Sequence, residues 1–245
     1  MDYELKTTVE DFGHAIPGGN EELRAKWRLN VCALADLERT IDDMFVELER
    51  RGEGELLQEL CPYFGAVWPG ARALVTYLAG LPAAEIAGRR IHEVGCGLAL
   101  PGMLAMRAGG IVSVSDCHPD VPQFLNRNLA LNDLDSIEFF PLDWRSAESV
   151  AAAGRRLENL DWLIGSDVLY DPDHPSTLAA FINRTLERKA GSRPRATITD
   201  PGRPWLQDFS SAMRRNGWKE DTTVFSVADP RGAKKDVFVL SYHVD

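Results

Sequence analysis

The chain has 245 residues, 44% of them hydrophobic and 26% charged, which is enough for one sizeable core and too short for two full domains. Its formal net charge of -10 disfavours nonspecific binding to nucleic acid or to an anionic membrane. No segment approaches the ~20 consecutive apolar residues of a membrane span, and the N-terminus carries acids and no apolar core of a signal peptide. We therefore expect a cytoplasmic protein that has neither nucleic acid nor a membrane as its partner.

The cysteines predict neither a disulfide framework nor a metal cluster. None of them forms a C-x-x-C pair, so we expect reduced thiols at Cys32, Cys61, Cys96 and Cys117. His92 lies four residues before Cys96, but in a strand-to-turn segment rather than on one face of a helix. We expect no metal there.

The first sixty residues have a helical pattern, which Gly52 and Gly54 interrupt. Apolar residues recur at three- and four-residue steps, namely Val31, Leu34, Leu37, Ile41, Phe45 and Leu48. Such a helix could simply pack on the main domain, or it could form a lid or a substrate platform. Because its single apolar stripe needs a surface that buries it, we expect residues 1–60 to be a helical cap over the site of a main domain, residues 61–245.

From residue 70 onward the pattern alternates between helix and strand. Helices are predicted at 71–80, 101–109, 119–131, 147–157, 175–189 and 204–216, and strands at 90–94, 111–115, 137–142, 162–165 and 196–199. Two further strand-like runs, 222–227 and 237–243, flank a turn at 229–232 and predict a hairpin. The order predicts a doubly wound α/β fold, with a mostly parallel seven-stranded sheet closed by a C-terminal hairpin.

In such sheets ligands bind beyond the carboxyl ends of the strands. Gly95 and Gly97 follow the first of these strands and allow a tight turn before a helix N-terminus, although Leu100 breaks the full G-x-G-x-x-G pattern. Asp116 follows the second strand, 19 residues after Gly97, where it could accept hydrogen bonds from ribose hydroxyls or else cap the next helix. After the third strand, Asp143 could accept from an adenine amino group.

Trp144 beside it could form an aromatic wall or only cover the edge of the core. Five carboxylates fall at the carboxyl ends of predicted strands, namely Glu93, Asp116, Asp143, Asp167 and Asp200. This acidic rim would repel the pyrophosphate of NAD. It would suit a ligand that carries an ammonium and a sulfonium group besides a ribose and an adenine, as S-adenosylmethionine does.

At these residues the chain resembles the class I, seven-β-strand methyltransferases of the lysine-methyltransferase-like branch. That branch includes the methylases of the electron-transfer flavoprotein β subunit, calmodulin and valosin-containing protein, and the resemblance is closest to bacterial members. The resemblance rests on the following segments: Pro62-Tyr63-Phe64-Gly65-Ala66-Val67-Trp68-Pro69-Gly70, residues 93–102, Asp116 with His118-Pro119-Asp120, Leu142-Asp143-Trp144, Gly165-Ser166-Asp167-Val168-Leu169-Tyr170, and Asp200-Pro201-Gly202-Arg203. The first sixty residues lie outside it.

The resemblance implies S-adenosylmethionine as cofactor, held by Trp68, Glu93, Gly95, Gly97, Asp116, Trp144 and Ser166. It also implies that Asp167 and Tyr170 face the methyl acceptor. Many relatives have Thr-Gly where this chain has Leu98-Ala99, and alanine in a left-handed conformation would be strained.

These features favour an S-adenosylmethionine-dependent methyltransferase that N-methylates an amine, with a protein lysine as the leading acceptor. We expect Asp167 to orient the amine, and Tyr170 to hydrogen-bond it or to wall the channel. The alternatives are a small-molecule amine methyltransferase, a noncatalytic cofactor-binding interaction protein that holds its partner with the N-terminal helices, and an NAD-dependent oxidoreductase.

Overall fold

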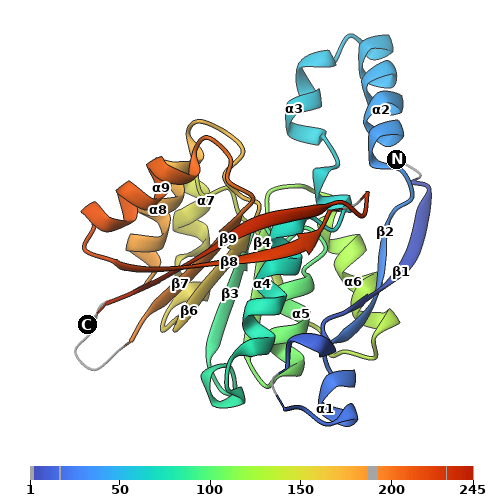
Figure 1. Ribbon diagram of the computed structural model, residues 1–245. Coiled ribbons are helices and arrows are strands. Elements are labelled where there is room, and N and C mark those ends of the chain that lie inside the picture. Colours follow the sequence, from blue (N-terminus) through green and yellow to red (C-terminus); the bar gives the residue numbers. More distant parts are fainter. Residues whose placement is uncertain (1–2, 17, 187–192, 230, 245) are drawn as a thin grey trace.

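A seven-stranded sheet forms the centre of the computed structural model, which describes residues 3–16, 18–186, 193–229 and 231–244 (Figure 1). Its strand order is β5-β4-β3-β6-β7-β9-β8. The parallel strands are β3 (Arg90–Val94), β4 (Ile111–Asp116), β5 (Glu138–Pro141), β6 (Trp162–Ser166) and β7 (Arg195–Asp200). An antiparallel hairpin of β8 (Lys219–Ala228) and β9 (Lys234–His243) pairs with β7. The doubly wound, mostly parallel sheet with its C-terminal hairpin is therefore confirmed.

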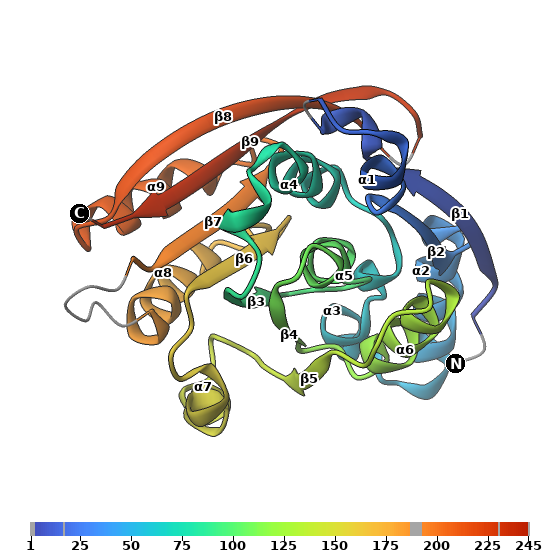
Figure 2. The same ribbon diagram turned by 90° about the horizontal axis from the view of Figure 1, so that it is seen from below.

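Helices cover both faces of the sheet (Figure 2). One face carries α4 (Pro69–Gly80), α5 (Leu100–Arg107) and α6 (Val121–Leu131), and the other carries α7 (Ala147–Ala153), α8 (His174–Thr185) and α9 (Leu206–Arg215). Each face has its own large buried apolar cluster. The helix predicted at 175–189 corresponds to α8, which ends at Thr185, and the last predicted residues, 187–189, lie outside the described residues. Within the described residues, no helix combines the length and apolarity that crossing a membrane requires.

The N-terminal extension is not purely helical, and that expectation was wrong for residues 5–34. These residues form an antiparallel pair, β1 (Leu5–Asp11) and β2 (Arg28–Leu34), with the short helix α1 (Glu21–Ala25) between them. Val31 and Leu34 belong to β2. Residues 28–31 of this strand alternate between exposed and buried, but residues 31–34 are all buried, so the alternating pattern of a half-exposed strand covers only its first half.

Helices follow in the second half of the extension, where α2 (Leu37–Arg51) leads to α3 (Leu57–Leu60). The helix α2 turns a different residue inward from the one predicted: Met44 is buried, whereas Phe45 is 47% exposed. In Figure 1, α2 and α3 stand beyond the body of the molecule, at the opposite end from α1.

Two asparagines on α6 attach β2 to the main domain. The side chain of Asn128 accepts a hydrogen bond from the backbone N–H of Cys32 at 2.7 Å and donates to its carbonyl at 3.2 Å. One helical turn later, Asn132 makes the same pair of bonds to Asn30, at 2.8 and 2.7 Å. The two side chains thus satisfy backbone groups of β2 as a neighbouring strand would.

We expect Asn128→Ala to lower the free energy of unfolding by about 2 to 4 kcal/mol, because it leaves a buried N–H and a buried carbonyl of Cys32 without partners. Asn132→Ala is the matched control. It removes the same two bonds from the exposed Asn30, whose backbone water can hydrate, and a further bond to the carbonyl of Asn128, so we expect a loss of about 1 kcal/mol. Urea denaturation measures both values, and equal losses would contradict this account of the attachment.

Candidate active site

The turn after β3 forms a glycine cradle at the carboxyl edge of the sheet. Gly95 and Gly97 both have left-handed backbones, with φ of 60° and 50°. A Cβ on Gly95 would lie 2.7 Å from Val168 and 3.6 Å from the ring of Trp144, and one on Gly97 would lie 3.1 Å from the carbonyl oxygen of Phe64. Both positions therefore require glycine, for conformation and for space.

The same turn shows the strain expected at Ala99. This residue is left-handed, with φ 55° and ψ 34°, and it is the N-cap of α5. The alanine costs roughly 1 kcal/mol relative to an unstrained residue, and the turn nevertheless forms.

Glu93, the penultimate residue of β3, is a fully buried carboxyl group. Its Oε2 accepts a hydrogen bond from the backbone N–H of Gly102 at 2.7 Å, and its Oε1 is buried without a partner among the described residues. Burial raises the pKa of Glu93 to about 8, against the backbone hydrogen bond that lowers it, with a further increase from the nearby Asp116. A cation placed against Oε1 would reverse this shift.

Asp116 ends β4 next to Glu93. Its Oδ2 accepts from the N–H of Gly97 at 2.9 Å, and its Oδ1 accepts from the N–H of His118 at 3.0 Å. The side chain therefore fixes the glycine turn from the adjacent strand and does not cap a helix. Burial raises its pKa, and the backbone N–H groups oppose this increase.

Trp144 lies near the cradle, and Asp143 is committed to a neighbour. The ring of Trp144 approaches Gly95, and its Nε1 is buried without a partner among the described residues. Asp143 forms two hydrogen bonds with the guanidinium of Arg145, at 2.9 and 3.0 Å. Partial burial acts to raise the pKa of Asp143, but these bonds bring it below its usual value.

Asp167 faces helix α4 and Arg203 rather than an open cleft. Its Oδ2 accepts from the N–H of Gly70 at 2.6 Å, and its Oδ1 forms an ion pair with Nη2 of Arg203 at 2.8 Å. Arg203 also pairs with Asp200 at 2.8 Å, and Thr199 donates to the carbonyl of Gly70 at 2.8 Å. Neither of the roles considered for Asp167 from the sequence, orienting the amine or capping its own following segment, describes these contacts.

Tyr170 has other neighbours than Asp167. It is 56% exposed, and its ring packs edge-on against His174 at 4.6 Å. Its pKa is raised to about 12, first by desolvation and then by Cys117 and Asp116 nearby. The hydroxyl therefore stays protonated at neutral pH and can donate a hydrogen bond, but it cannot act as a general base.

The remaining predicted residues, Trp68 and Ser166, border the same edge. Trp68 is the N-cap of α4, and its Nε1 donates to the carbonyl of Tyr63 at 2.8 Å, which shapes the segment whose Phe64 carbonyl lies over Gly97. Ser166 is the last residue of β6. The structure thus brings Glu93, Gly95, Gly97, Asp116 and Trp144 together and holds Trp68 at one rim. Asp167 and Tyr170 contact different partners, Gly70 and Arg203 for the former and His174 for the latter.

Arginines neutralise three of the five carboxylates in the acidic rim that the sequence predicts. Arg145 pairs with Asp143, and Arg203 pairs with both Asp167 and Asp200. Of the five strand-end carboxylates, Glu93 and Asp116, directly beside the glycine cradle, have no arginine partner among the described residues. An unpartnered buried acid, a second acid and an unpartnered indole N–H fit a ligand with a cationic amine and polar oxygen atoms.

Sequence reasoning missed His118 as part of this site. Its Nδ1 accepts from the N–H of Asp120 at 3.1 Å, so its Nε2 must carry the proton that it shares with the carbonyl of Leu60 at 3.1 Å. Its ring also stacks obliquely on Phe64 at 4.3 Å. No spacing rule signals this contact, because Leu60 lies 58 residues away.

His92 and Cys96 do not form a site together. Both ring nitrogens of His92 are 2.9 Å from serine hydroxyls, those of Ser113 and Ser115, and burial lowers its pKa to about 3. Cys96 Sγ contacts the carbonyl of Gly97.

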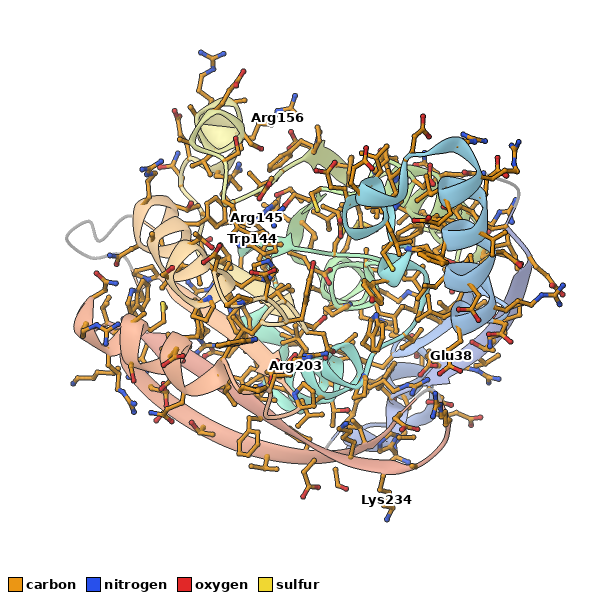
Figure 3. The ribbon with its side chains drawn as sticks, turned by 90° about the horizontal axis from the view of Figure 1, so that it is seen from above. Glu38, Trp144, Arg145, Arg156, Arg203 and Lys234 are labelled. Carbon is orange, nitrogen blue, oxygen red and sulfur yellow. The ribbon has the colours of Figure 1, made fainter. Side chains whose placement is uncertain are left out.

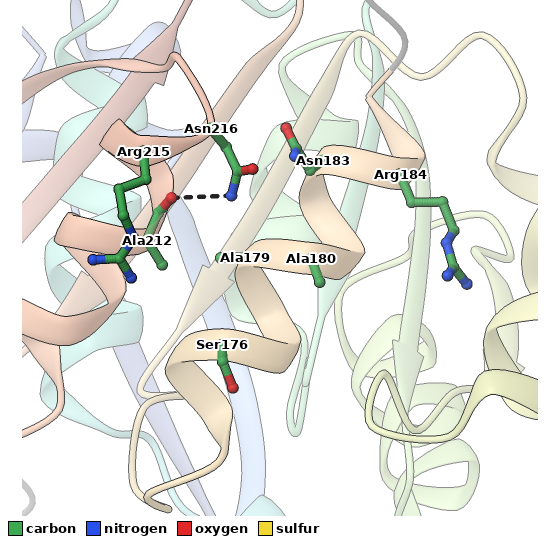
Figure 4. Close-up of a pocket in the computed structure, with 8 residues that line it drawn as sticks. All are labelled: Ser176, Ala179, Ala180, Asn183, Arg184, Ala212, Arg215 and Asn216. Atoms are coloured by element: carbon green, nitrogen blue, oxygen red, sulfur yellow. Dashed lines mark hydrogen bonds between the residues drawn. The ribbon is translucent and has the colours of Figure 1, made fainter.

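A hollow of about 540 Å³ lies elsewhere, between α8 and α9 on the outside of the sheet (Figure 4). Small and basic side chains such as Ala179 and Arg215 line it. It contains no carboxylate and none of the residues predicted for the site, so we place the candidate active site at the glycine cradle.

Comparison with known structures places the fold among methyltransferases. A SAM-dependent methyltransferase from Agrobacterium tumefaciens superposes with a TM-score of 0.54 over 74% of this chain and 64% of that chain, at 14% sequence identity. At this identity the likeness concerns the fold alone.

The sequence comparison identifies the family. The lysine methyltransferase family matches residues 61–192, more than half of the chain, and the protein therefore belongs to that family. It is 32% identical over 131 residues to the histone-arginine methyltransferase METTL23 of Xenopus laevis, covering 52% of this chain and 54% of the relative. A histidine protein methyltransferase 1 homolog of Dictyostelium discoideum is 27% identical over 106 residues, covering 42% of this chain and 33% of that protein. The chain thus spans about half the length of METTL23 and about a third of the length of the Dictyostelium protein.

The raised pKa of Glu93 predicts that the cofactor-free protein loses stability as the pH rises from 6.5 to 8. A carboxyl with a folded pKa above its usual value of 4.5 favours the folded state at low pH and loses this contribution as the pH passes through the folded pKa. Below pH 6.5 the lowered pKa of His92 acts in the opposite direction, so the two effects separate by pH.

We expect the loss to reach roughly 2 kcal/mol, or about 5 °C in Tm. Thermal denaturation at several pH values measures it. In Glu93→Gln the slope above pH 6.5 should largely disappear, whereas the exposed control Glu148→Gln should keep it. A Glu93→Gln protein with the wild-type slope would show that Glu93 does not titrate as described.

Proposed function

We propose that the protein transfers a methyl group from S-adenosylmethionine to a nitrogen atom of a protein side chain. The observation that carries the proposal is the pair of acids without arginine partners, Glu93 and Asp116, set against the glycine cradle. Family membership adds the reaction class. The free thiols of the described cysteines suit a reducing compartment, and we propose the cytoplasm.

The residues of the cradle match the parts of this cofactor. Asp116 would accept hydrogen bonds from the ribose hydroxyls, Glu93 would face the amino group, and Gly95 and Gly97 would let the backbone approach closely. Trp144 would supply an aromatic wall and an N–H donor. The cofactor supplies a methyl group that is already activated by a sulfonium, so the protein's main task is to position the acceptor for an in-line displacement.

The acceptor class follows from the family and its relatives. The family description names lysine, and the relatives that match are named for histone arginine and for protein histidine. All three are nitrogen nucleophiles on protein side chains. We keep lysine as the leading acceptor, which must lose its proton before it attacks.

We assign Tyr170 and Asp167 different roles in this reaction. Tyr170, half exposed near Asp116, would donate a hydrogen bond at the mouth of the site or wall it. Asp167 would act as a positioning residue, because its carboxylate holds the N-terminus of α4 at Gly70 and pairs with Arg203. It would thereby hold the segment that runs from Trp68 to the cradle.

The proposed cofactor is tested by calorimetry with S-adenosylmethionine. Wild type should bind, and Asp116→Ala should bind more weakly by roughly 1.5 to 3 kcal/mol, the contribution of hydrogen bonds to a charged group. Because Asp116 also fixes the turn, Asp116→Asn serves as a second variant that keeps an acceptor for Gly97. Wild-type affinity in both variants would remove Asp116 from the ribose site, and absence of binding by wild type would refute the proposed function.

The positioning role of Asp167 is tested by a double-mutant cycle. Asp167→Asn should reduce stability by about 1.5 to 3 kcal/mol and also weaken cofactor binding, because Arg203 and the start of α4 lose a charged partner. In an Arg203→Met background the same change should cost clearly less. If Asp167 instead oriented the acceptor, Tm and cofactor affinity would stay unchanged and turnover alone would fall.

The acceptor class is tested with tritiated S-adenosylmethionine and a lysate from cells that lack the protein. We expect label in bands that disappear after protease treatment, and amino-acid analysis of these bands identifies the methylated side chain. Label that survives the protease would indicate a small-molecule amine, and a protein that binds the cofactor but labels nothing would support a noncatalytic role.

A further inference from the structure

The segment 36–59, which we call the arm, carries most of the molecule's excess negative charge. It contains nine acidic and three basic residues, in a chain whose net charge is -10. All three arginines are already paired within the arm: Arg50 and Arg51 with Glu47, and Arg39 with Asp43 at 3.7 Å. Glu38 pairs with Arg231 in the turn between β8 and β9, and the remaining carboxylates project a field that the arm itself does not neutralise.

The outer face of the arm also exposes two adjacent large apolar residues. The inward stripe of α2 consists of residues such as Met44 and Leu48, which are buried. Phe45 and Val46 lie outside that stripe and are 47% and 65% exposed. By helical spacing, the exposed Asp42 and Glu49 flank this pair one turn before and one turn after it.

The arm is joined directly to the candidate active site. Leu60, the residue that directly follows the arm and ends α3, accepts the proton of His118 Nε2 on its carbonyl, and the backbone N–H of His118 donates to Asp116. Figure 1 shows α2 and α3 rising from one end of the molecule, and Figure 3, which looks onto that end, shows them at the upper right, with Trp144 and Arg203 nearer the middle of the view. A protein held by the arm would therefore lie against the same end as the glycine cradle.

We propose that the outer face of α2, centred on Phe45 and Val46, docks a lysine- and arginine-rich segment of the protein that the active site methylates; this rests on the proposed function. The charge of the arm selects the occupant, because it attracts cationic segments and repels nucleic acids and anionic membranes. The exposed aromatic side chain supplies an apolar anchor of the kind that dominates protein interfaces. Docking would thus be separate from the chemistry and would raise the local concentration of the acceptor at the site.

The test measures binding of fluorescently labelled core histones, used as a lysine- and arginine-rich probe, by anisotropy at physiological salt. One variant, Phe45→Gln with Val46→Gln, removes the apolar pair without changing the charge, and glutamine preserves the helix because its helix propensity is higher than that of phenylalanine or valine. A second variant, Asp42→Asn with Glu49→Gln, removes two flanking charges. The matched control, Glu21→Gln with Glu22→Gln, removes two exposed charges from α1 at the far end of the molecule.

We expect each arm variant to bind the histones about tenfold more weakly than wild type, and the control to stay within about twofold of it. Wild-type protein that does not bind the probe, an apolar-pair variant that binds like wild type, or a control that loses as much as the arm variants would each overturn the proposal. Calorimetry with S-adenosylmethionine is run on the same proteins. If the arm variants bind histones like wild type and the cofactor still binds, the docking surface alone is refuted. If the arm variants bind histones more weakly but wild type does not bind the cofactor, the proposed function alone is refuted.

Discussion

Carboxylates buried at the ends of parallel strands must find hydrogen-bond donors, and in this protein the turns and helix N-termini of the carboxyl edge provide them. Glu93 binds the N–H of Gly102, Asp116 binds that of Gly97, and Asp167 binds that of Gly70. Asp143 and Asp200 do the same with the turns that follow them. Because an ionised group without such partners would be costly to bury, the acids hold the loops of the carboxyl edge in place.

The arginines then divide this edge into two parts with different electrostatic character. Arg203 neutralises Asp167 and Asp200 on the side of β7, where the edge becomes a fixed support for α4. On the side of β3 and β4, Glu93 and Asp116 keep their need for positive charge, and the raised pKa of Glu93 is a measure of that need. A cationic ligand gains more on the second side, since it relieves a cost that the protein already bears.

The sheet could be predicted from the sequence because its signals are local. Strand and helix periods alternate from residue 70 onward, and a left-handed Ala99 follows from its place in the glycine turn. The acids at the strand ends were also visible. Their partners were not, because pairing between Gly70 and Asp167 spans 97 residues and no local pattern encodes it. The positioning role that we propose for Asp167 rests on this contact and on its ion pair with Arg203.

The N-terminal extension shows a second limit of local signals. Val31 and Leu34 fit a helical period only by coincidence, since residues 31–34 are all buried and the alternation typical of a strand is limited to residues 28–31. Its position depends instead on Asn128 and Asn132, polar residues on a helix face where a sequence pattern would place solvent. Only Ala35 and Asp36 separate β2 from α2, so the placement of β2 fixes where α2 begins, and in this helix Met44 is buried and Phe45 exposed. The exposed face of the arm is therefore a consequence of how the strand before it is anchored.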